Sequence, residues 1–188
     1  MDLKKLLLAS TVLVSSLFAG TYNIDKSHSS VAFKVKHMMI SNVKGTFDQF
    51  KGSFEYDEKA NMLKSLDGVI EVASINTANE KRDKHLRADD IFDAKKYPKI
   101  TFKLDKVDGD MAYGELTMKG VTKKVKLDYE AGGSIVNPWG KKVAGFSLSG
   151  KINRSDYGIT WNKVLEAGGV AVSDSVKLEI DIEGVLKK

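Results

Sequence analysis

The stretch Val31-Ala-Phe-Lys-Val-Lys-His37 decides the fold class of this chain. Val31, Phe33 and Val35 share one face with His37, while both lysines lie on the other face. Successive side chains of a β strand point to opposite sides of the sheet. The pattern therefore predicts a strand with one buried face and one solvated face.

The same alternation returns along the rest of the chain. Strict examples occupy residues 99–105, 124–130 and 176–183, and looser ones occupy residues 45–56, 66–75, 111–118 and 143–152. Asp108-Gly109 and Gly132-Gly133 supply turn residues between strands. About eight antiparallel strands that each have one apolar face must bury those faces together, as a sandwich or as a closed barrel. The sequence therefore predicts an all-β fold.

One region interrupts the strand pattern. Thr77-Ala-Asn-Glu80 has the spacing of a capping box, with threonine as the N-cap and glutamate three residues later. It precedes a charged stretch that ends at Tyr97-Pro98. We expect a short helical insert over about residues 77–97, with its helix over about residues 78–87. The side chains expected to pack inward from this insert are Leu86, Ile91 and Phe92.

The composition limits the chemistry that the chain can perform. It has 188 residues, a formal net charge of +5 and no cysteine. This length suits a single domain. Without cysteine the chain has no disulfide framework, thiolate metal site, cysteine nucleophile or lipidated cysteine. Basic residues alternate with acidic ones, which argues against nucleic-acid binding and favours transient contact with an anionic lipid surface.

The N-terminus has the organisation of a secretory signal peptide. Two lysines precede an apolar run over residues 6–19, which is shorter than a membrane-spanning helix. The small residues Ala19-Gly20 favour cleavage after Ala19. We therefore expect residues 1–19 to be removed and residues 20–188 to form one exported domain. An uncleaved membrane anchor is the alternative interpretation.

The interior of such a barrel can be filled by side chains or can hold one small apolar ligand. The alternation of residues leaves both alternatives open. His37 continues the inward register of Phe33 and Val35, so its imidazole either hydrogen-bonds a ligand head group or is satisfied by a backbone carbonyl.

The chain after residue 19 also resembles a known family. The matching segments are Tyr22-Asn-Ile-Asp25, His28-Ser29, Phe33-Lys-Val-Lys-His37, Gly45-Thr-Phe47, Phe50-Lys-Gly52, Arg82-Asp-Lys-His-Leu86, Asp90-Ile-Phe-Asp93, Tyr97-Pro-Lys-Ile-Thr-Phe102, Gly114-Glu-Leu-Thr-Met-Lys-Gly-Val-Thr122, Asn153-Arg-Ser-Asp-Tyr-Gly158, Trp161-Asn162 and Val172-Ser-Asp-Ser-Val176. Together they resemble the YceI-like family of lipid- or polyisoprenoid-binding proteins. The resemblance implies an extended eight-stranded antiparallel lipocalin-like barrel that holds a long apolar chain, such as an isoprenoid quinone or a fatty-acid derivative, in a bacterial periplasm. It implies no established catalytic reaction.

Residues on the inward registers are candidates for a cavity wall, where their apolar surface would hold the tail of a ligand. These candidates are Phe33, Val35, His37, Phe54, Ile100, Phe102, Leu127, Tyr129, Phe146, Leu148 and Ile180. Candidates for head-group contact near the mouth are Arg82, His85, Arg154 and Trp161, again with His37. For Arg82 and His85 the alternative is a solvated helix face. For Arg154 it is a structural turn, in which Asp156 caps the loop and Arg154 pairs with a carboxylate.

Sequence motifs for catalysis and metal binding are missing. The chain has no Gly-x-Ser-x-Gly elbow, no His-Glu-x-x-His helix and no glycine-rich phosphate loop. His28 and His37 would face opposite sides of one regular strand, so without a turn between them they could not share a metal ion. We expect no catalytic residue, no metal site and no cofactor other than a bound lipid or isoprenoid.

The sequence therefore favours a periplasmic carrier that sequesters a long-chain amphiphile. One alternative is an enzyme that isomerises or hydrolyses an apolar substrate inside the barrel, with His37 or Asp156 as acid or base. Another is a stress-induced structural protein with a filled core. We expect a monomer or a homodimer, and an exposed first strand at residues 22–25 would allow the dimer.

Overall fold

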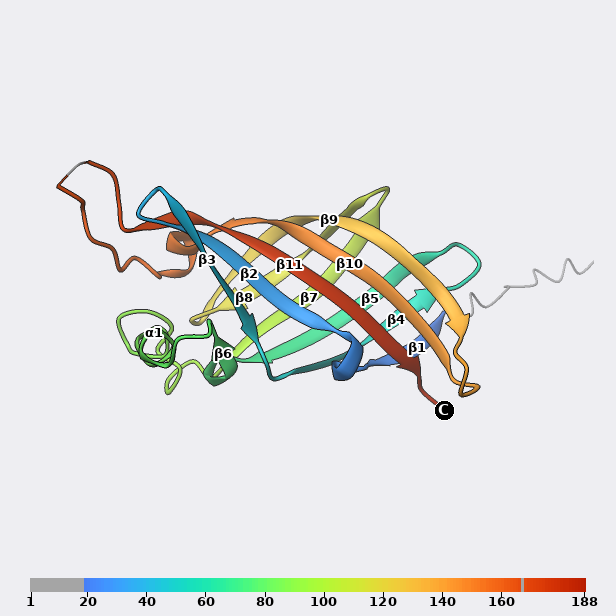
Figure 1. Cartoon of the computed structure of the whole chain (residues 1–188). Helices are drawn as coiled ribbons and strands as arrows, with labels where there is room; N and C mark the ends of the chain where they lie inside the picture. Colours follow the sequence, from blue (N-terminus) through green and yellow to red (C-terminus); the bar gives the residue numbers. More distant parts are fainter. Residues whose placement is uncertain (1–18, 167) are drawn as a thin grey trace, which may run out of the picture.

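The computed structural model of the chain, shown in Figure 1, describes residues 19–166 and 168–188. Its strands close into an eight-stranded antiparallel barrel, which confirms the predicted fold class. In chain order the elements are β1 (Gly20–Ile24), η1 (Lys26–His28), β2 (Ser30–His37), β3 (Ser41–Phe47), β4 (Phe50–Asp57), β5 (Met62–Glu71), η2 (Val72–Ser74), β6 (Ile75–Asn76), α1 (Glu80–Leu86), β7 (Lys99–Asp108), β8 (Met111–Met118), β9 (Val121–Val136), β10 (Lys142–Asn153), η3 (Arg154–Tyr157) and β11 (Val172–Leu186).

The barrel has eight long strands because three of them are interrupted. β1 and β2 pair with successive parts of β11, so together they act as one long strand. β3 and β4 likewise form one long strand, which pairs with β2 and β1, and β5 and β6 form the next long strand, which pairs with β4 and β3. β1 pairs with β11 on one side and with β4 on the other, and this closes the barrel.

The three interruptions lie at the same level of the barrel. The Nζ of Lys26 in η1 donates to Oε1 of Gln49 at 2.8 Å, and the amide of Gln49 donates to Oγ of Ser74 in η2 at 3.0 Å. Gln49 lies between β3 and β4, where the alternation predicted one strand over residues 45–56. That strand breaks because the Asp48 carboxylate accepts side-chain hydrogen bonds from β3 and β6, which bends the chain at this point.

The helical insert is present, but its helix begins later than predicted. Asn79, rather than Thr77, is the N-cap of α1, because its side chain accepts the Arg82 amide hydrogen bond at 3.0 Å. Ala78 has a φ of 56°, which is outside the helical region. Thr77 instead donates its amide to the buried carboxylate of Asp83 at 2.9 Å, which ties the helix to the strand before it.

The first strand is not an exposed edge. Tyr22 in β1 is 0% exposed, and its ring stacks on that of Phe54 with centroids 5.2 Å apart. Because β1 has hydrogen-bonded neighbours on both sides, it has no free edge with which a second copy could pair. The predicted exposed first strand at residues 22–25, through which a dimer could have formed, is therefore wrong, and the oligomeric state stays a prediction.

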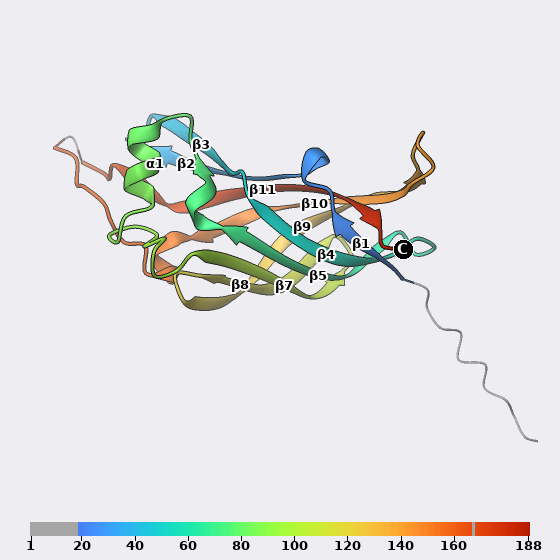
Figure 2. The same ribbon diagram turned by 90° about the horizontal axis from the view of Figure 1, so that it is seen from below.

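Two clusters of buried side chains lie at different levels of the barrel. Figures 1 and 2 place β1 and the C-terminus at one end and α1 at the other. The cluster near β1 contains Tyr22, Phe54, Tyr56, Leu63, Leu66, Leu104, Ala112, Leu127, Tyr129, Ala144, Phe146, Leu148 and Ile182. The cluster near α1 contains Phe47, Val72, Ile75, Ile91, Ile100, Leu116, Met118, Tyr157 and Ile159. Leu86 and Phe92 pack against the second cluster, as the sequence predicted.

The predicted signal peptide cannot be placed in this fold, since residues 1–18 lie outside the described residues. Among the helices that the structure describes, none combines the length and the apolar character needed to cross a membrane.

Candidate ligand-binding cavity

A cavity of about 850 Å³ occupies the half of the barrel near α1. Its wall is built mainly from inward-facing apolar side chains of the long strands, with α1 and the chain around η3 at its mouth. A volume of this size is in the range of small-molecule binding sites, about 300–1,000 Å³. The sequence allowed either a filled core or a ligand cavity inside the barrel, and the structure has a cavity.

Most of the predicted wall residues line this cavity. They are Phe33, Val35, His37, Ile100, Phe102, Leu127, Leu148 and Ile180. All four residues predicted at the mouth, Arg82, His85, Arg154 and Trp161, line it as well. These positions make them candidates for ligand contact.

Phe54, Tyr129 and Phe146 do not line the cavity, which corrects three of the predicted wall residues. Phe54 is 1% exposed, and its ring packs closely against Gly184, where a Cβ would lie only 2.4 Å from Phe54 Cε1. Tyr129 accepts the Leu63 amide hydrogen bond at 3.0 Å, and its burial raises the pKa of its hydroxyl to about 12. The three rings face inward as expected, but they fill the barrel below the cavity.

Further wall residues were missed, although they carry the same alternation. They include Leu66, Ile70, Leu116, Met118, Val125, Ile152, Val176, Leu178 and Ile182. Each lies on a strand that the sequence predicted, on a position of the inward face. The alternation in the sequence identifies them as inward-facing residues. It does not distinguish inward-facing residues that line the cavity from those that belong to the packed core.

Gly68 leaves open space in the wall. It lies on β5 between the inward-facing Leu66 and Ile70, and a Cβ added to it would meet only the Phe102 carbonyl oxygen, at 4.0 Å. Gly114 on β8 is different, because a Cβ there would lie 2.5 Å from the Lys103 carbonyl oxygen. The glycine at position 68 therefore enlarges the cavity without being required by backbone packing.

The mouth is formed where α1 faces the chain after η3. The rings of His85 and Trp161 meet edge-on with centroids 5.1 Å apart, and His85 Nε2 lies 3.0 Å from Oδ2 of Asp90. Arg82 donates its Nε to Oγ1 of Thr77 at 2.7 Å. These contacts hold Arg82 and His85 at the cavity, so α1 is not only a solvated face.

Arg154 is the buried cation of the mouth, with a side chain 9% exposed. Its guanidinium donates to four backbone carbonyl oxygens, those of Ile159, Trp161, Val172 and Ser173, at 2.8–3.3 Å. Burial lowers the pKa of Arg154 from its ordinary value. The expected alternative, a carboxylate partner, is wrong, because these carbonyls occupy the guanidinium and hold the chain beyond η3 against β11.

Asp156 has no place in the cavity wall. The carboxylate that binds this turn is Asp174, which accepts hydrogen bonds from the amide and the hydroxyl of Ser155 at 3.0 and 2.7 Å. The polar wall residues at the mouth are His37, Asn79, Lys81, Arg82, Lys84, His85 and Arg154, and Lys51 lies further along β4. No carboxylate belongs to the wall among the residues that the structure describes.

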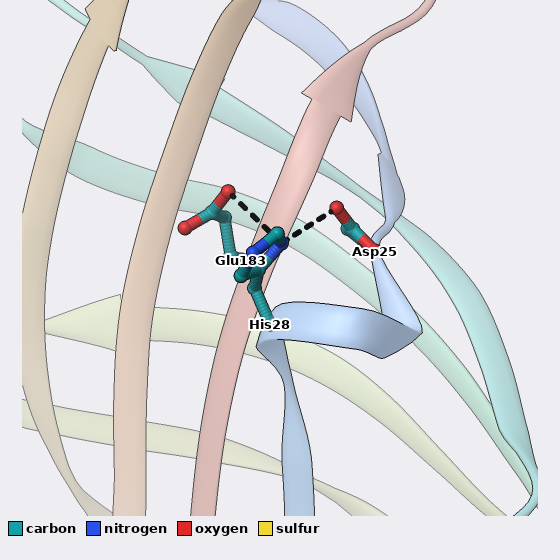
Figure 3. Close-up of side chains that lie close together, drawn as sticks. All are labelled: Asp25, His28 and Glu183. Atoms are coloured by element: carbon teal, nitrogen blue, oxygen red, sulfur yellow. Dashed lines mark hydrogen bonds and ion pairs between the residues drawn. The ribbon is translucent and has the colours of Figure 1, made fainter. Parts of the chain in front are cut away.

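His28 lies on the outside of the barrel, apart from the cavity (Figure 3). Its Nδ1 is 2.9 Å from Oδ2 of Asp25 and 3.9 Å from Oε1 of Glu183. The hydrogen bond with His28 lowers the pKa of Asp25, and the same bond raises the pKa of His28. Three potential metal ligands therefore lie within 4.8 Å of one another. Their own hydrogen bonds account for this arrangement, which fastens η1 to β11.

Comparison with other proteins agrees with this architecture. Residues 22–184 match the model of the YceI-like domain. The chain belongs to the YceI-like domain family. The YceI-like chain is 42% identical over 165 residues to the UPF0312 protein SERP2314 of Staphylococcus epidermidis, a match that covers 86% of this chain and 95% of the relative. It is 41% identical over 163 residues to the UPF0312 protein SA2479 of Staphylococcus aureus, with the same coverage of 86% and 95%.

Two solved structures show the same fold as this YceI-like barrel. The Campylobacter jejuni YceI protein is 42% identical, with a TM-score of 0.70 over 87% of this chain and 96% of that chain. A polyisoprenoid binding domain from Saccharophagus degradans is 16% identical, with a TM-score of 0.63 over 88% of this chain and 98% of that chain. At such low identity the second likeness shows the fold alone. Family and cavity together indicate a barrel that binds a ligand.

Proposed function

We propose that this YceI-like protein is a carrier that sequesters a long-chain amphiphile, such as a polyisoprenoid, an isoprenoid quinone or a fatty-acid derivative. The observation that carries the proposal is the cavity of about 850 Å³, whose wall is apolar apart from Lys51 and the polar residues at the mouth. This distribution fits a molecule with an apolar tail and one polar end. The same fold is found in a polyisoprenoid binding domain from Saccharophagus degradans, which is in keeping with this class of ligand.

The apolar wall supplies enough free energy for binding without polar recognition of the tail. Burial of one methylene group contributes about 0.8 kcal/mol, so ten buried methylenes contribute about 8 kcal/mol before the cost of ordering the chain. Leu127, Leu148 and Ile182 at the deep end offer no hydrogen-bonding side chain. Selection among tails therefore rests on length and shape rather than on chemistry.

Selection of the head group belongs to the mouth. His37, Arg82, His85 and Trp161 each present a hydrogen-bond donor or an aromatic edge where the tail would leave the cavity. Arg154 positions this region, because it holds the chain from Ile159 to Ser173 in place. The bound lipid is the one small molecule that the proposal requires.

Export to the periplasm is part of the proposal. It is supported by the apolar run over residues 6–19 and by the small residues at the expected cleavage position. An exported carrier without a lipidated cysteine reaches membranes only by transient contact of its folded domain.

The test is direct analysis of the protein as purified without detergent. Solvent extraction followed by mass spectrometry should recover a long-chain amphiphile, and the stripped protein should rebind a fluorescent long-chain fatty acid or an isoprenoid quinone. Repeated absence of lipid together with failure to bind either probe would overturn the proposal. The recovered molecule should be unchanged after long incubation, because a new product would instead favour an enzyme using His37.

A further inference from the structure

Exposed apolar side chains project from the end of the barrel where the cavity opens. Met38, Met39 and Ile40, in the turn between β2 and β3, are 42%, 53% and 85% exposed, and Val164, in the loop before β11, is 86% exposed. Figures 1 and 2 both place this turn and this loop at the α1 end, away from the C-terminus. We call these four residues the rim.

The turn and the loop of the rim touch each other and border the cavity. The Met38 amide donates to the Ala171 carbonyl oxygen at 2.8 Å, and Ala171 is a wall residue. A Cβ added to Gly169 would lie 3.3 Å from Cγ of Met39. The turn and the loop that carry the rim therefore lie side by side next to the mouth.

The backbone of the turn is strained. Met38 and Met39 have φ values of 51° and 63°, in the left-handed region that favours Asn and Gly. The turn is held in this conformation by the Met38 contact with Ala171 and by a 3.2 Å hydrogen bond from the Ile40 amide to the His37 carbonyl oxygen. The two exposed methionines occupy turn positions that favour Asn and Gly, and they contribute nothing to the barrel core. This points to a role in contact with another molecule rather than in stabilising the fold.

Basic side chains surround the rim. Lys81 and Lys84 on α1 are exposed at the mouth, Lys163 precedes Val164, and Lys36 precedes the turn on the outer face of β2. Among the ion pairs between described residues, none includes these four lysines. The exposed acids nearby are Glu80 on α1, Asp89 and Asp90 just after it, and Glu166 in the loop, and Asp90 is already paired with His85 at 3.0 Å. The rim thus has apolar tips, and the segments beside it carry four lysines that make no ion pair among the described residues.

We propose that the rim docks on an anionic lipid bilayer, with its four apolar side chains among the head groups and the lysines against the lipid phosphates. Flexible methionine side chains suit a fluid and irregular surface, and each basic residue near an anionic surface strengthens the attraction. The proposal rests on the proposed function, because a carrier needs its cavity to face the membrane when the lipid is exchanged.

The other end of the barrel provides the matched comparison. Ile135, Val136 and Trp139, around the β9–β10 turn, are 66%, 64% and 78% exposed. The buried rings of Tyr22 and Phe54 fill the barrel at that end, so docking there would leave the cavity away from the bilayer. Docking through the rim and docking through the opposite end therefore differ in which apolar residues are needed.

The test measures flotation with vesicles of phosphatidylglycerol and with vesicles of phosphatidylcholine. The rim variant Met39→Ser/Ile40→Ser/Val164→Ser should bind phosphatidylglycerol vesicles about tenfold less than the unmodified protein. The control variant Ile135→Ser/Val136→Ser/Trp139→Ser should bind them as the unmodified protein does. Binding of the unmodified protein should fall with added salt and should be weaker on phosphatidylcholine.

Each outcome decides the question. Equal loss in both variants, loss only in the control, or no flotation of the unmodified protein overturns docking through the rim, as does a dimer in solution that the rim variant abolishes. Binding of a fluorescent fatty acid without vesicles is measured in parallel, and the rim variant should retain it because its residues lie outside the wall. A protein that floats but binds no fatty acid would instead overturn the carrier function.

Discussion

The ring of Phe146 meets the ring of Phe54 edge-on, with centroids 5.1 Å apart and an angle of 86° between the planes. Phe54 in turn stacks on Tyr22, and Phe146 lies beside Tyr129 with centroids 6.4 Å apart. These rings fill the barrel below the cavity, and we call this packed level the floor. The same barrel therefore has a filled level and a hollow level, and the boundary between them limits the length of tail that can enter.

The floor should be the most sensitive part of the barrel to truncation. Phe54→Ala removes a ring that is 1% exposed and leaves a void that Gly184 cannot fill, so it should lower the free energy of unfolding by about 3–5 kcal/mol. Phe54→Leu, which keeps most of the volume, should cost clearly less. Urea denaturation measures both, and equal losses would contradict a packed floor.

Filling the open space at Gly68 should reduce ligand binding while leaving the fold intact. Gly68→Met places its side chain where a Cβ meets only one atom, at 4.0 Å, so the side chain extends into the cavity. We expect affinity for a fluorescent long-chain fatty acid to fall about tenfold or more, with an unchanged or higher melting temperature. The control Gly114→Ala should destabilise the barrel, because its Cβ would lie 2.5 Å from a backbone oxygen. Unchanged affinity in Gly68→Met would mean that the ligand binds elsewhere.

Loss of the Arg154 guanidinium should loosen the mouth. Arg154→Met leaves four buried or partly buried carbonyl oxygens without their donor, so the free energy of unfolding should fall by about 2–4 kcal/mol. Arg154→Lys should not restore it, because an ammonium group lacks the planar donor arrangement. Hydrogen exchange should accelerate at the amides of residues 159–173. If Arg154→Lys were as stable as the unmodified protein, the positive charge alone would account for the contribution of Arg154 to stability.

The His28–Asp25 pair should make stability depend on pH in a defined direction (Figure 3). The pKa of His28 is raised, so its contribution is present below the unfolded value of about 6.5 and is lost as pH rises through the folded pKa. The pKa of Asp25 is lowered, so its contribution is present above the unfolded value of about 3.9 and is lost as pH falls through the folded pKa.

The pair should therefore stabilise the barrel most between about pH 4 and pH 6.5. The difference in melting temperature between the unmodified protein and His28→Asn should be larger at about pH 5.5 than at about pH 9. Asp25→Asn should remove this pH dependence, since it removes the partner that raises the pKa of His28. A difference that is constant with pH would show that His28 acts only through its neutral hydrogen bond.

Two predictions made from short stretches of sequence were wrong: the N-cap of the helix and the exposure of the first strand. Thr77 fits the capping box by spacing, but the buried carboxylate of Asp83 binds its amide and hydroxyl, so Asn79 takes over the cap. Tyr22 lies near the expected N-terminus of the exported domain, where an exposed edge is common. Pairing with β11, from the other end of the chain, buries it instead.

The sequence by itself determined which side of each strand faces inward, because side chains alternate strictly along a strand and apolar residues follow that period. The alternation therefore predicted an all-β fold, either a sandwich or a barrel, and the family resemblance pointed to the barrel. The alternation also placed Phe33, Phe102, Phe54 and Phe146 on inward faces, which is correct for all four. Only the tertiary structure decided that the first pair lines a cavity while the second pair fills the floor. The physical reason is that the position of a residue along the barrel axis depends on the register between strands that are distant in sequence, such as the pairing of Tyr22 with Leu186. The alternation within one strand carries no information about that register.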